Sequence, residues 1–129
     1  VFGADLIAGF PTETEDMFRR SLDLVAECGL TYLHVFPFSP RPGTPAARMP
    51  QVASAVARER ARRLREIGAL TLRRHLEREL GARRRVLVES DCTGRTEQFT
   101  TVKLRTASPP GTIVECTVAG HDGRHLLAA

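Results

Sequence analysis

The 129-residue sequence has little of what marks a metal, redox or disulfide-rich protein. Its three cysteines are Cys28, Cys92 and Cys116. They are spaced too widely for a zinc or redox motif, and their odd number argues against a disulfide framework. We therefore expect all three to be small, buried, apolar residues. The four histidines, which are His34, His75, His121 and His125, form no HxH or HxxxH pair with a carboxylate at helical spacing, so no metal site is predicted.

Long hydrophobic runs are also missing. No apolar stretch approaches the roughly 20 residues that a membrane span needs, and no basic and then apolar leader opens the chain. These absences predict a cytoplasmic protein without a membrane partner. The first residue is not Met and lies in what looks like a strand, so we expect a fragment of a longer protein.

Basic residues are concentrated in the second part of the chain. Residues 1–50 carry four Arg against six acidic residues, whereas residues 51–129 carry fifteen Lys or Arg against nine. Eleven arginines lie between Arg58 and Arg85, and some of them, such as Arg62, have glutamates at helical spacing. The remaining surplus favours a surface that faces phosphates, and a solvated helix face is the alternative.

The first 38 residues predict a strand, a helix and a parallel strand. Ala4–Phe10 is a nearly continuous apolar run, as expected for a strand covered on both faces. Thr12 and Glu15 have the spacing of a capping box, and Gly29 is expected to end the helix. Tyr32–Phe38 is the second strand, so this segment has the unit that joins parallel neighbours.

A stiff loop follows the second predicted strand. Its prolines fix φ at positions 40, 42 and 45, Gly43 permits a positive φ, and Ser39, Arg41 and Thr44 supply donors. This pattern predicts a ligand-contacting edge of the sheet, and a stiff linker is the alternative. A helix is expected next, from about Ala53 to Leu80, kinked or divided at Gly68.

The last 45 residues predict a small closed antiparallel barrel. The expected strands are Arg85–Ser90, Gln98–Arg105, Thr112–Val118 and Arg124–Leu127, separated by turns that include Thr93 and Gly94. Small barrels of this type often bind RNA. Arg95 in the loop and Lys103 in a strand offer phosphate contacts, and Phe99 offers a stacking surface, although the core is the more common place for a phenylalanine.

Two segments carry a resemblance to the radical S-adenosylmethionine methylthiotransferase family. Gly3-Ala4-Asp5-Leu6-Ile7-Ala8-Gly9-Phe10-Pro11-Thr12-Glu13-Thr14 and Phe36-Pro37-Phe38-Ser39-Pro40-Arg41-Pro42-Gly43-Thr44-Pro45-Ala46-Ala47 resemble late strands of its catalytic barrel. Residues 81–128 resemble the RNA-binding TRAM domain. The fold class implied is α/β plus all-β: residues 1–50 end a partial TIM barrel, residues 51–80 are a helical linker, and residues 81–129 are a TRAM (OB-like) β-barrel. Gly94-Arg95-Thr96-Glu97-Gln98-Phe99-Thr100 is similar to the branch that acts on N6-threonylcarbamoyladenosine in tRNA.

The resemblance implies an enzyme that adds a methylthio group to C2 of a modified adenosine next to the anticodon. S-adenosylmethionine would be both radical source and methyl donor, with two 4Fe-4S clusters in the parent enzyme. The residues implied at the cofactor are Ile7, Gly9, Phe38, Ser39, Arg41, Gly43 and Thr44. Those expected at tRNA are Arg83, Arg84, Arg95, Phe99 and Lys103. No catalytic residue is identified, and no cluster-binding CxxxCxxC segment is present, so the chain is expected to be inactive alone.

Two other interpretations remain. A methylthiotransferase for isopentenyladenosine in tRNA, or for an aspartate of a ribosomal protein, would share most of these features. An RNA-binding module without an enzymatic parent would explain the basic helix and the barrel. It would leave the strand-helix-strand segment and the proline-rich loop without a role.

Overall fold

The computed structural model describes all 129 residues, which form two compact units, Val1–Thr71 and Leu72–Ala129. A single long helix, α2 (Ser54–Arg78), begins in the first unit and ends in the second. It is one unbroken helix, so Gly68 does not divide it. A Cβ at Gly68 would lie 3.2 Å from the Cβ of Leu33, so this glycine lets the helix approach the sheet closely.

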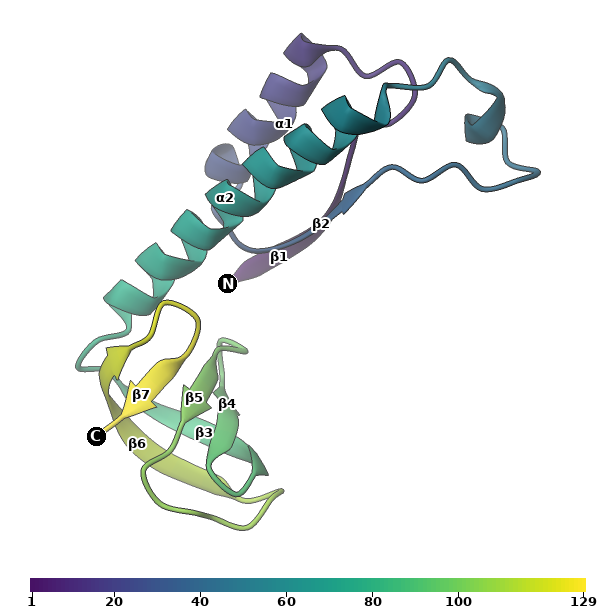
Figure 1. Ribbon diagram of the computed structural model, residues 1–129. Coiled ribbons are helices and arrows are strands. Elements are labelled where there is room, and N and C mark those ends of the chain that lie inside the picture. Colours follow the sequence, from purple (N-terminus) through teal and green to yellow (C-terminus); the bar gives the residue numbers. More distant parts are fainter. The chain divides into compact units, whose positions relative to one another are not determined.

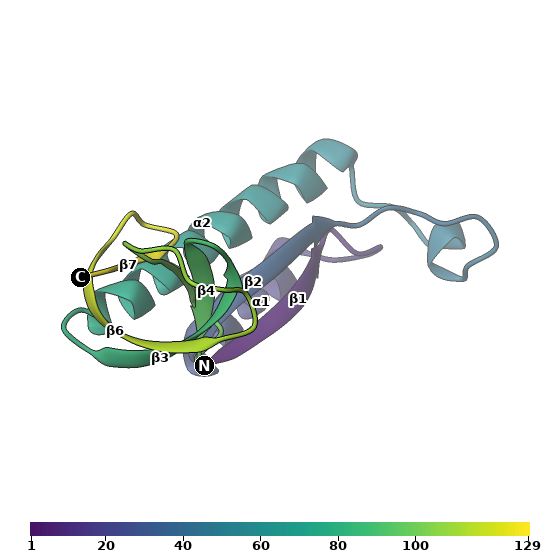
Figure 2. The ribbon, with the colours of Figure 1, turned by 90° about the horizontal axis from the view of Figure 1, so that it is seen from below.

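The first unit contains the predicted strand, helix and parallel strand. β1 (Phe2–Ala8) and β2 (Leu30–Pro37) pair in parallel, and α1 (Glu15–Glu27) connects them (Figure 1). Both helices cover one face of this small sheet (Figure 2). The buried core between them consists of Ala8, Phe18, Val25, Val35, Ala61 and Leu64. The apolar positions of the sequence therefore build the core because both helices turn their apolar stripes toward one sheet face.

The N-terminus of α1 differs from the prediction. The N-cap is Thr14, whose Oγ1 accepts a hydrogen bond from the backbone N–H of Met17 at 3.2 Å. Thr12 lies two residues earlier with φ 70°, so the capping box predicted from Thr12 and Glu15 is wrong. A Thr-x-Thr-Glu sequence offers two threonines as caps, and the turn after β1 selects the second.

The second unit is a closed five-stranded barrel in the order β3-β4-β5-β7-β6. Its strands are β3 (Arg83–Ser90), β4 (Thr93–Thr96), β5 (Thr101–Lys103), β6 (Ile113–His121) and β7 (Leu126–Ala128). The predicted barrel is confirmed, with two corrections. The segment read as a turn at Thr93 and Gly94 is strand β4, and β5 pairs with β7 in parallel, so the barrel is not wholly antiparallel.

The interior of the barrel is apolar. Val86, Val102, Val118 and Leu126 are buried there, and Leu76 from the last turns of α2 belongs to the same cluster. These residues alternate with exposed ones along their strands, as expected for a half-buried sheet. The outward positions of β3, β4 and β6 are therefore available for binding.

The prediction of buried cysteines is wrong. Cys28 and Cys92 are exposed, and Cys116 is half-buried; all three are free thiols. Burial raises the pKa of the Cys116 thiol. Cys28 is exposed because it is the C-cap of α1, a position that composition does not reveal. None of the helices combines the length and the apolar character that a membrane-spanning helix requires.

Candidate nucleic-acid interface

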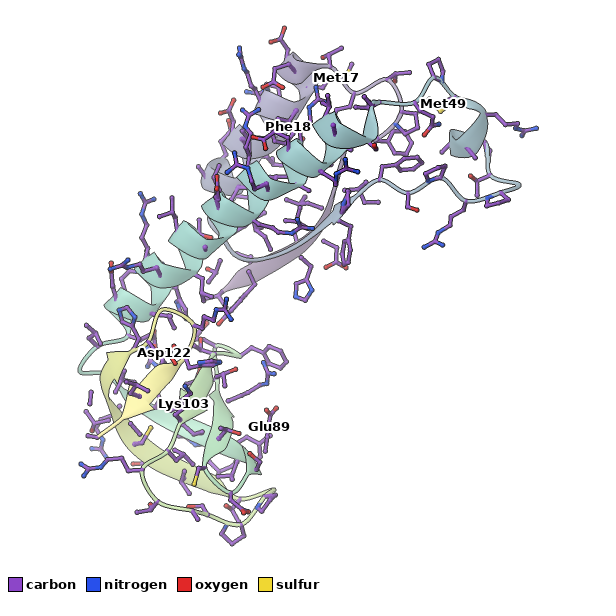
Figure 3. All side chains as sticks on the ribbon, viewed as in Figure 1. Met17, Phe18, Met49, Glu89, Lys103 and Asp122 are labelled. Carbon is purple, nitrogen blue, oxygen red and sulfur yellow. The ribbon has the colours of Figure 1, made fainter.

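An arginine and a phenylalanine stack on the outside of the barrel. The Arg95 guanidinium lies over the Phe99 ring, 4.3 Å from its centroid. The Nε of Arg95 donates to Glu89 Oε1 at 2.8 Å, which fixes the guanidinium in place. Figure 3 marks Glu89 on the barrel. Phe99 is 68% exposed, so the expectation that it belongs to the core is wrong.

Phe99 is held by the short segment that joins β4 to β5. Its N–H donates to the carbonyl of Thr96 at 2.9 Å, and Thr96 Oγ1 accepts the N–H groups of Gln98 and Thr100 at 3.2 Å each. Thr100 Oγ1 hydrogen-bonds His75 Nε2 at 2.8 Å, and both side chains are buried. The exposed ring is therefore held in place by a buried hydrogen-bond network of Thr96, Thr100 and His75.

The other residues predicted to bind RNA each form an ion pair on the barrel. The pairs are Arg83 with Glu115 at 2.8 Å, Arg84 with Glu79 at 2.5 Å, and Lys103 with Asp122 at 2.8 Å. Figure 3 labels Lys103 and Asp122. Glu79 is buried and Arg84 holds the pKa of its carboxyl below the usual range, so Arg84 has a clear structural role. Arg83 and Lys103 are more exposed than Arg84 and pair at the surface.

Asp122 organises the turn between β6 and β7. It accepts hydrogen bonds from Lys103, from the His125 ring and from two backbone N–H groups. These contacts, led by Lys103, hold the pKa of Asp122 far below its ordinary value. Lys103 therefore both stabilises a turn and adds positive charge to the surface.

An apolar shelf of Leu87 and Ile113, which the sequence does not predict, lies beside Arg95. Leu87 pairs with Arg95 on β4 and with Ile113 on β6, so these three residues lie in one row across neighbouring strands. Leu87 and Ile113 are about half exposed, and with Arg95 they line a shallow pocket of about 190 Å³. The composition of Thr93-Gly94 predicts a turn and not strand β4, so the register that forms this row cannot be predicted from the sequence.

The residues implied at the cofactor lie in the first unit. Ile7 on β1 pairs with Phe36 on β2, and both side chains are exposed on the sheet face that the helices leave open. Phe38 packs edge to face against Phe10, with the ring centroids 5.3 Å apart. An apolar surface therefore runs along the carboxyl ends of both strands.

Gly9 has a packing role that the sequence did not reveal. A Cβ at this position would lie 2.3 Å from the Cβ of Ala57, and φ is 75°. Its N–H donates to Glu13 Oε2 at 2.9 Å, and Glu13 Oε1 pairs with Arg60 at 2.9 Å. The glycine is therefore required for close contact with α2, and this network fixes the turn after β1.

The proline-rich loop is stabilised by its own hydrogen bonds. The N–H of Thr44 donates to the carbonyl of Arg41 at 3.2 Å, and Gly43 has φ 85°, as a type II turn requires. Thr44 Oγ1 donates to the same carbonyl and accepts from Ala47, at the start of the short 3-10 helix η1 (Ala46–Arg48). Thr44 is thus used by the loop, whereas Ser39 and Arg41 are exposed and make no side-chain hydrogen bond.

The chain does not fit an iron-sulfur cluster. No group of three or more histidine, cysteine, aspartate or glutamate side chains could hold a metal ion. Cys28 belongs to the first unit, whereas Cys92 and Cys116 belong to the second. A cluster would need ligands that this chain does not supply.

No family model matches the chain. The curated proteins that resemble it are named as enzymes that methylthiolate tRNA. It is 46% identical over 119 residues to "Threonylcarbamoyladenosine tRNA methylthiotransferase MtaB" of Rickettsia prowazekii, covering 92% of this chain and 28% of that protein. It is 30% identical over 117 residues to the Aquifex aeolicus protein of the same name, covering 90% of this chain and 28% of that protein.

A second group of relatives has another printed name. The chain is 43% identical over 96 residues to "tRNA-2-methylthio-N(6)-dimethylallyladenosine synthase" of Chloroflexus aurantiacus, covering 70% of this chain and 21% of that protein. The chain thus spans between a fifth and a third of the length of these curated relatives.

Proposed function

Because this chain belongs to the methylthiotransferase family, we propose that it is the tRNA-binding part, with an edge of the catalytic barrel, of a tRNA-modifying enzyme. The observation that carries the proposal is the 46% identity over 92% of the chain to a relative named for this activity. The closed barrel is compatible with a TRAM-like module, and Arg95 and Phe99 would contact RNA through a charge and an aromatic face.

The substrate we propose is N6-threonylcarbamoyladenosine in tRNA, methylthiolated at C2. The Gly94–Thr100 segment supports this branch, and so does the name of the 46% identical relative. Relatives named for dimethylallyladenosine match at lower identity than 46%, two of them at 43% over 70% of the chain and at 35% over 96% of it, which makes that nucleoside the second candidate.

The first unit would be the end of a radical S-adenosylmethionine partial TIM barrel. Parallel β1 and β2, with helices on one face, suit that architecture. Bound S-adenosylmethionine supplies the radical and the methyl group. Ile7 and Phe38 would offer it apolar contacts, and Ser39 and Arg41 would offer free donors, while Gly9, Gly43 and Thr44 would hold the backbone that presents them. Because no cluster ligands are present, we propose that the chain is inactive alone and binds its clusters through the rest of a longer enzyme.

The first experiment tests tRNA binding through the salt dependence of affinity. Each neutralised phosphate releases counterions, so affinity should fall steeply as salt rises. Substituting Arg83, Arg95 and Lys103 by glutamine should flatten the slope by about 2 to 3 units. The matched control neutralises the partner acids Glu89 and Glu115, and this variant should bind as tightly as wild type or more tightly. Parallel slopes in all three proteins would contradict the proposal.

The second experiment identifies the substrate. Nucleosides of tRNA from a strain without the gene for the parent enzyme should lack the methylthio group on N6-threonylcarbamoyladenosine and keep it on isopentenyladenosine. Mass spectrometry of digested tRNA measures both. Loss from isopentenyladenosine instead would favour the second candidate.

The third experiment tests the loop. In the parent enzyme, Arg41→Ala and Gly43→Val should impair S-adenosylmethionine cleavage more than tRNA binding. Gly43→Val places a β-branched residue at φ 85° and would distort the turn that presents Arg41. Unchanged cleavage in both variants would reduce the loop to a linker.

A further inference from the structure

Phe99 has two features that are unfavourable for stability when taken alone. Its φ of 62° lies in the left-handed region, which bulky residues without a special role rarely occupy. Its ring is 68% exposed, so it gains little from burial. A residue that carries backbone strain and stays in water is a candidate for binding.

The surrounding structure holds this conformation firmly. The N–H of Phe99 donates to Thr96, and the Thr96 hydroxyl binds the N–H of Thr100. Thr100 in turn contacts His75 on α2, within the same unit. Because three buried residues fix the segment, the ring is presented in one orientation before any partner arrives, which lowers the entropy cost of binding.

Arg95 covers one face of the Phe99 ring and leaves the ring largely in solvent. Arg95 also lines the shallow pocket, together with the apolar shelf of Leu87 and Ile113 and with Arg85, Thr96 and Glu97, so one residue contacts the aromatic ring and borders the shelf. An unpaired nucleotide has a flat base and one negative charge, and both match this arrangement.

We propose that Phe99, with Arg95 and the shelf of Leu87 and Ile113, binds one unpaired nucleobase by stacking. The site does not bind a duplex in this way, because the faces of paired bases are covered by their neighbours in the helix. It also needs a base and not only a phosphate, because the ring binds by stacking. This rests on the proposed function and adds to it the part of the RNA that the barrel selects, a single-stranded segment. A peptide partner is less well matched, since the unit carries ten basic against seven acidic residues and only one exposed aromatic ring.

The test uses the full 129-residue chain and two RNAs with equal numbers of phosphates. One is an unstructured strand of about 12 nucleotides that carries 2-aminopurine, and the other is fully paired. Phe99→Leu should weaken binding to the unpaired strand by about fivefold to 100-fold and relieve the quenching of 2-aminopurine. Binding to the paired RNA should change by less than about twofold.

Two further variants complete the test. Phe99→Trp should bind the unpaired strand at least as tightly as wild type, because its face is larger. Phe2→Leu is the matched control, since Phe2 is 70% exposed and receives the same substitution, and it should bind like wild type. Equal binding by Phe99→Leu and Phe2→Leu, or an equal loss with both RNAs, would overturn the stacking proposal.

The outcome separates this proposal from the proposed function. If the chain binds RNA with a steep salt slope and Phe99→Leu has no effect, the stacking site is refuted and the tRNA-binding role stands. If the chain binds neither RNA, both are refuted. If Phe99→Leu acts only on the unpaired strand without changing the salt slope, the stacking site is supported, because the phosphate contacts are intact.

Discussion

The two units each contain a phenylalanine with arginine guanidinium groups over its ring, in opposite environments. Phe18 on α1 is 1% exposed, with Arg63 at 4.7 Å and Arg60 at 5.5 Å from its centroid. Phe99 is 68% exposed, with Arg95 at 4.3 Å. The same pair of residue types is therefore part of the core in one unit and part of the surface in the other.

The difference lies in what surrounds each ring. Phe18 of α1 packs in the core with Ala61 and Leu64 of α2. Arg60 forms an ion pair with Glu13, so its charge is neutralised inside the unit. Phe99 lies outside the closed barrel, where Arg95 pairs with Glu89 at the surface and also donates to the carbonyl of Phe99. An arginine–phenylalanine pair that is buried on all sides stabilises the fold. A pair with one ring face open to solvent can bind another ring on that face.

The largest expected effect comes from truncating the buried ring. Phe18→Ala should destabilise the first unit by about 4 kcal/mol, because it leaves a cavity in the core. Phe99→Ala should change stability by no more than about 0.5 kcal/mol. Urea denaturation followed by hydrogen exchange of α1 and β3 peptides measures each unit separately. Equal losses of unfolding free energy in both variants would contradict the contrast between a core phenylalanine and a surface phenylalanine.

The buried ion pair should have the next largest effect. Glu13→Gln should cost about 3 kcal/mol, because it leaves the Arg60 charge, whose side chain is 7% exposed, without its carboxylate partner. Glu89→Gln is the control, since Arg95 and Glu89 are far more exposed, and should cost less than about 1 kcal/mol. A small loss in Glu13→Gln would mean that Glu15, at 3.5 Å from Arg60, can replace it.

Weakening the buried hydrogen-bond network beneath Phe99 should have a moderate effect on both stability and binding. Thr100→Val keeps the shape of the side chain and removes the hydroxyl that contacts His75, which should cost about 1 to 2 kcal/mol. The affinity for unpaired RNA should fall as well, because the ring loses its fixed orientation. Calorimetry and RNA titration measure the two effects, and wild-type RNA affinity in this variant would show that Phe99 needs no buried support.

A smaller effect of opposite sign is expected from relieving the strain at Phe99. Asparagine tolerates the left-handed region, so Phe99→Asn should raise stability by up to about 1 kcal/mol while weakening binding to unpaired RNA. Thermal unfolding checks the first part of this prediction. A clear loss of stability would mean that the exposed ring contributes to the fold after all.

The smallest effect expected is a dependence of barrel stability on pH. Burial lowers the pKa of His75 below its ordinary value of 6.5, with nearby Glu79 opposing the shift and Arg78 and Arg84 adding to it. The unfolded chain therefore binds a proton more readily, and stability should fall as pH drops below about 6.5. Denaturation between about pH 7.5 and 5.5 should reveal this slope, and His75→Gln should flatten it. A slope that persists in the variant would assign it to another group.

Much of the local structure could be predicted because its signals are local. Alternation and helical spacing identified the parallel strand pair, the long helix and most barrel strands. Strand β4 was missed because Thr93-Gly94 has the composition of a turn. In the structure Gly94 lies against β3, where a Cβ would be 2.3 Å from the carbonyl oxygen of Leu87, so this glycine serves close strand packing.

The candidate site was only partly predictable. Arg95 and Phe99 were named from a short motif, but their stacking and the row with Leu87 and Ile113 depend on strand register. The prediction that the cysteines are buried is wrong because it rests on the average burial of this residue type. The exposure of Cys28 depends instead on its position as the C-cap of α1.

Periodicity, charge and motif are properties of neighbouring residues, so the amino-acid sequence alone predicts the types of element, the basic second half and the family. Which phenylalanine lies in the core and which is exposed to water depends on long-range packing. Phe18 lies on an apolar stripe at helical spacing, whereas Phe99 ends the short segment Gly94–Phe99, and neither local pattern alone predicts how much of the ring is exposed. Phe18 is buried because α2, more than 30 residues away, packs over it, whereas closure of the barrel leaves Phe99 outside.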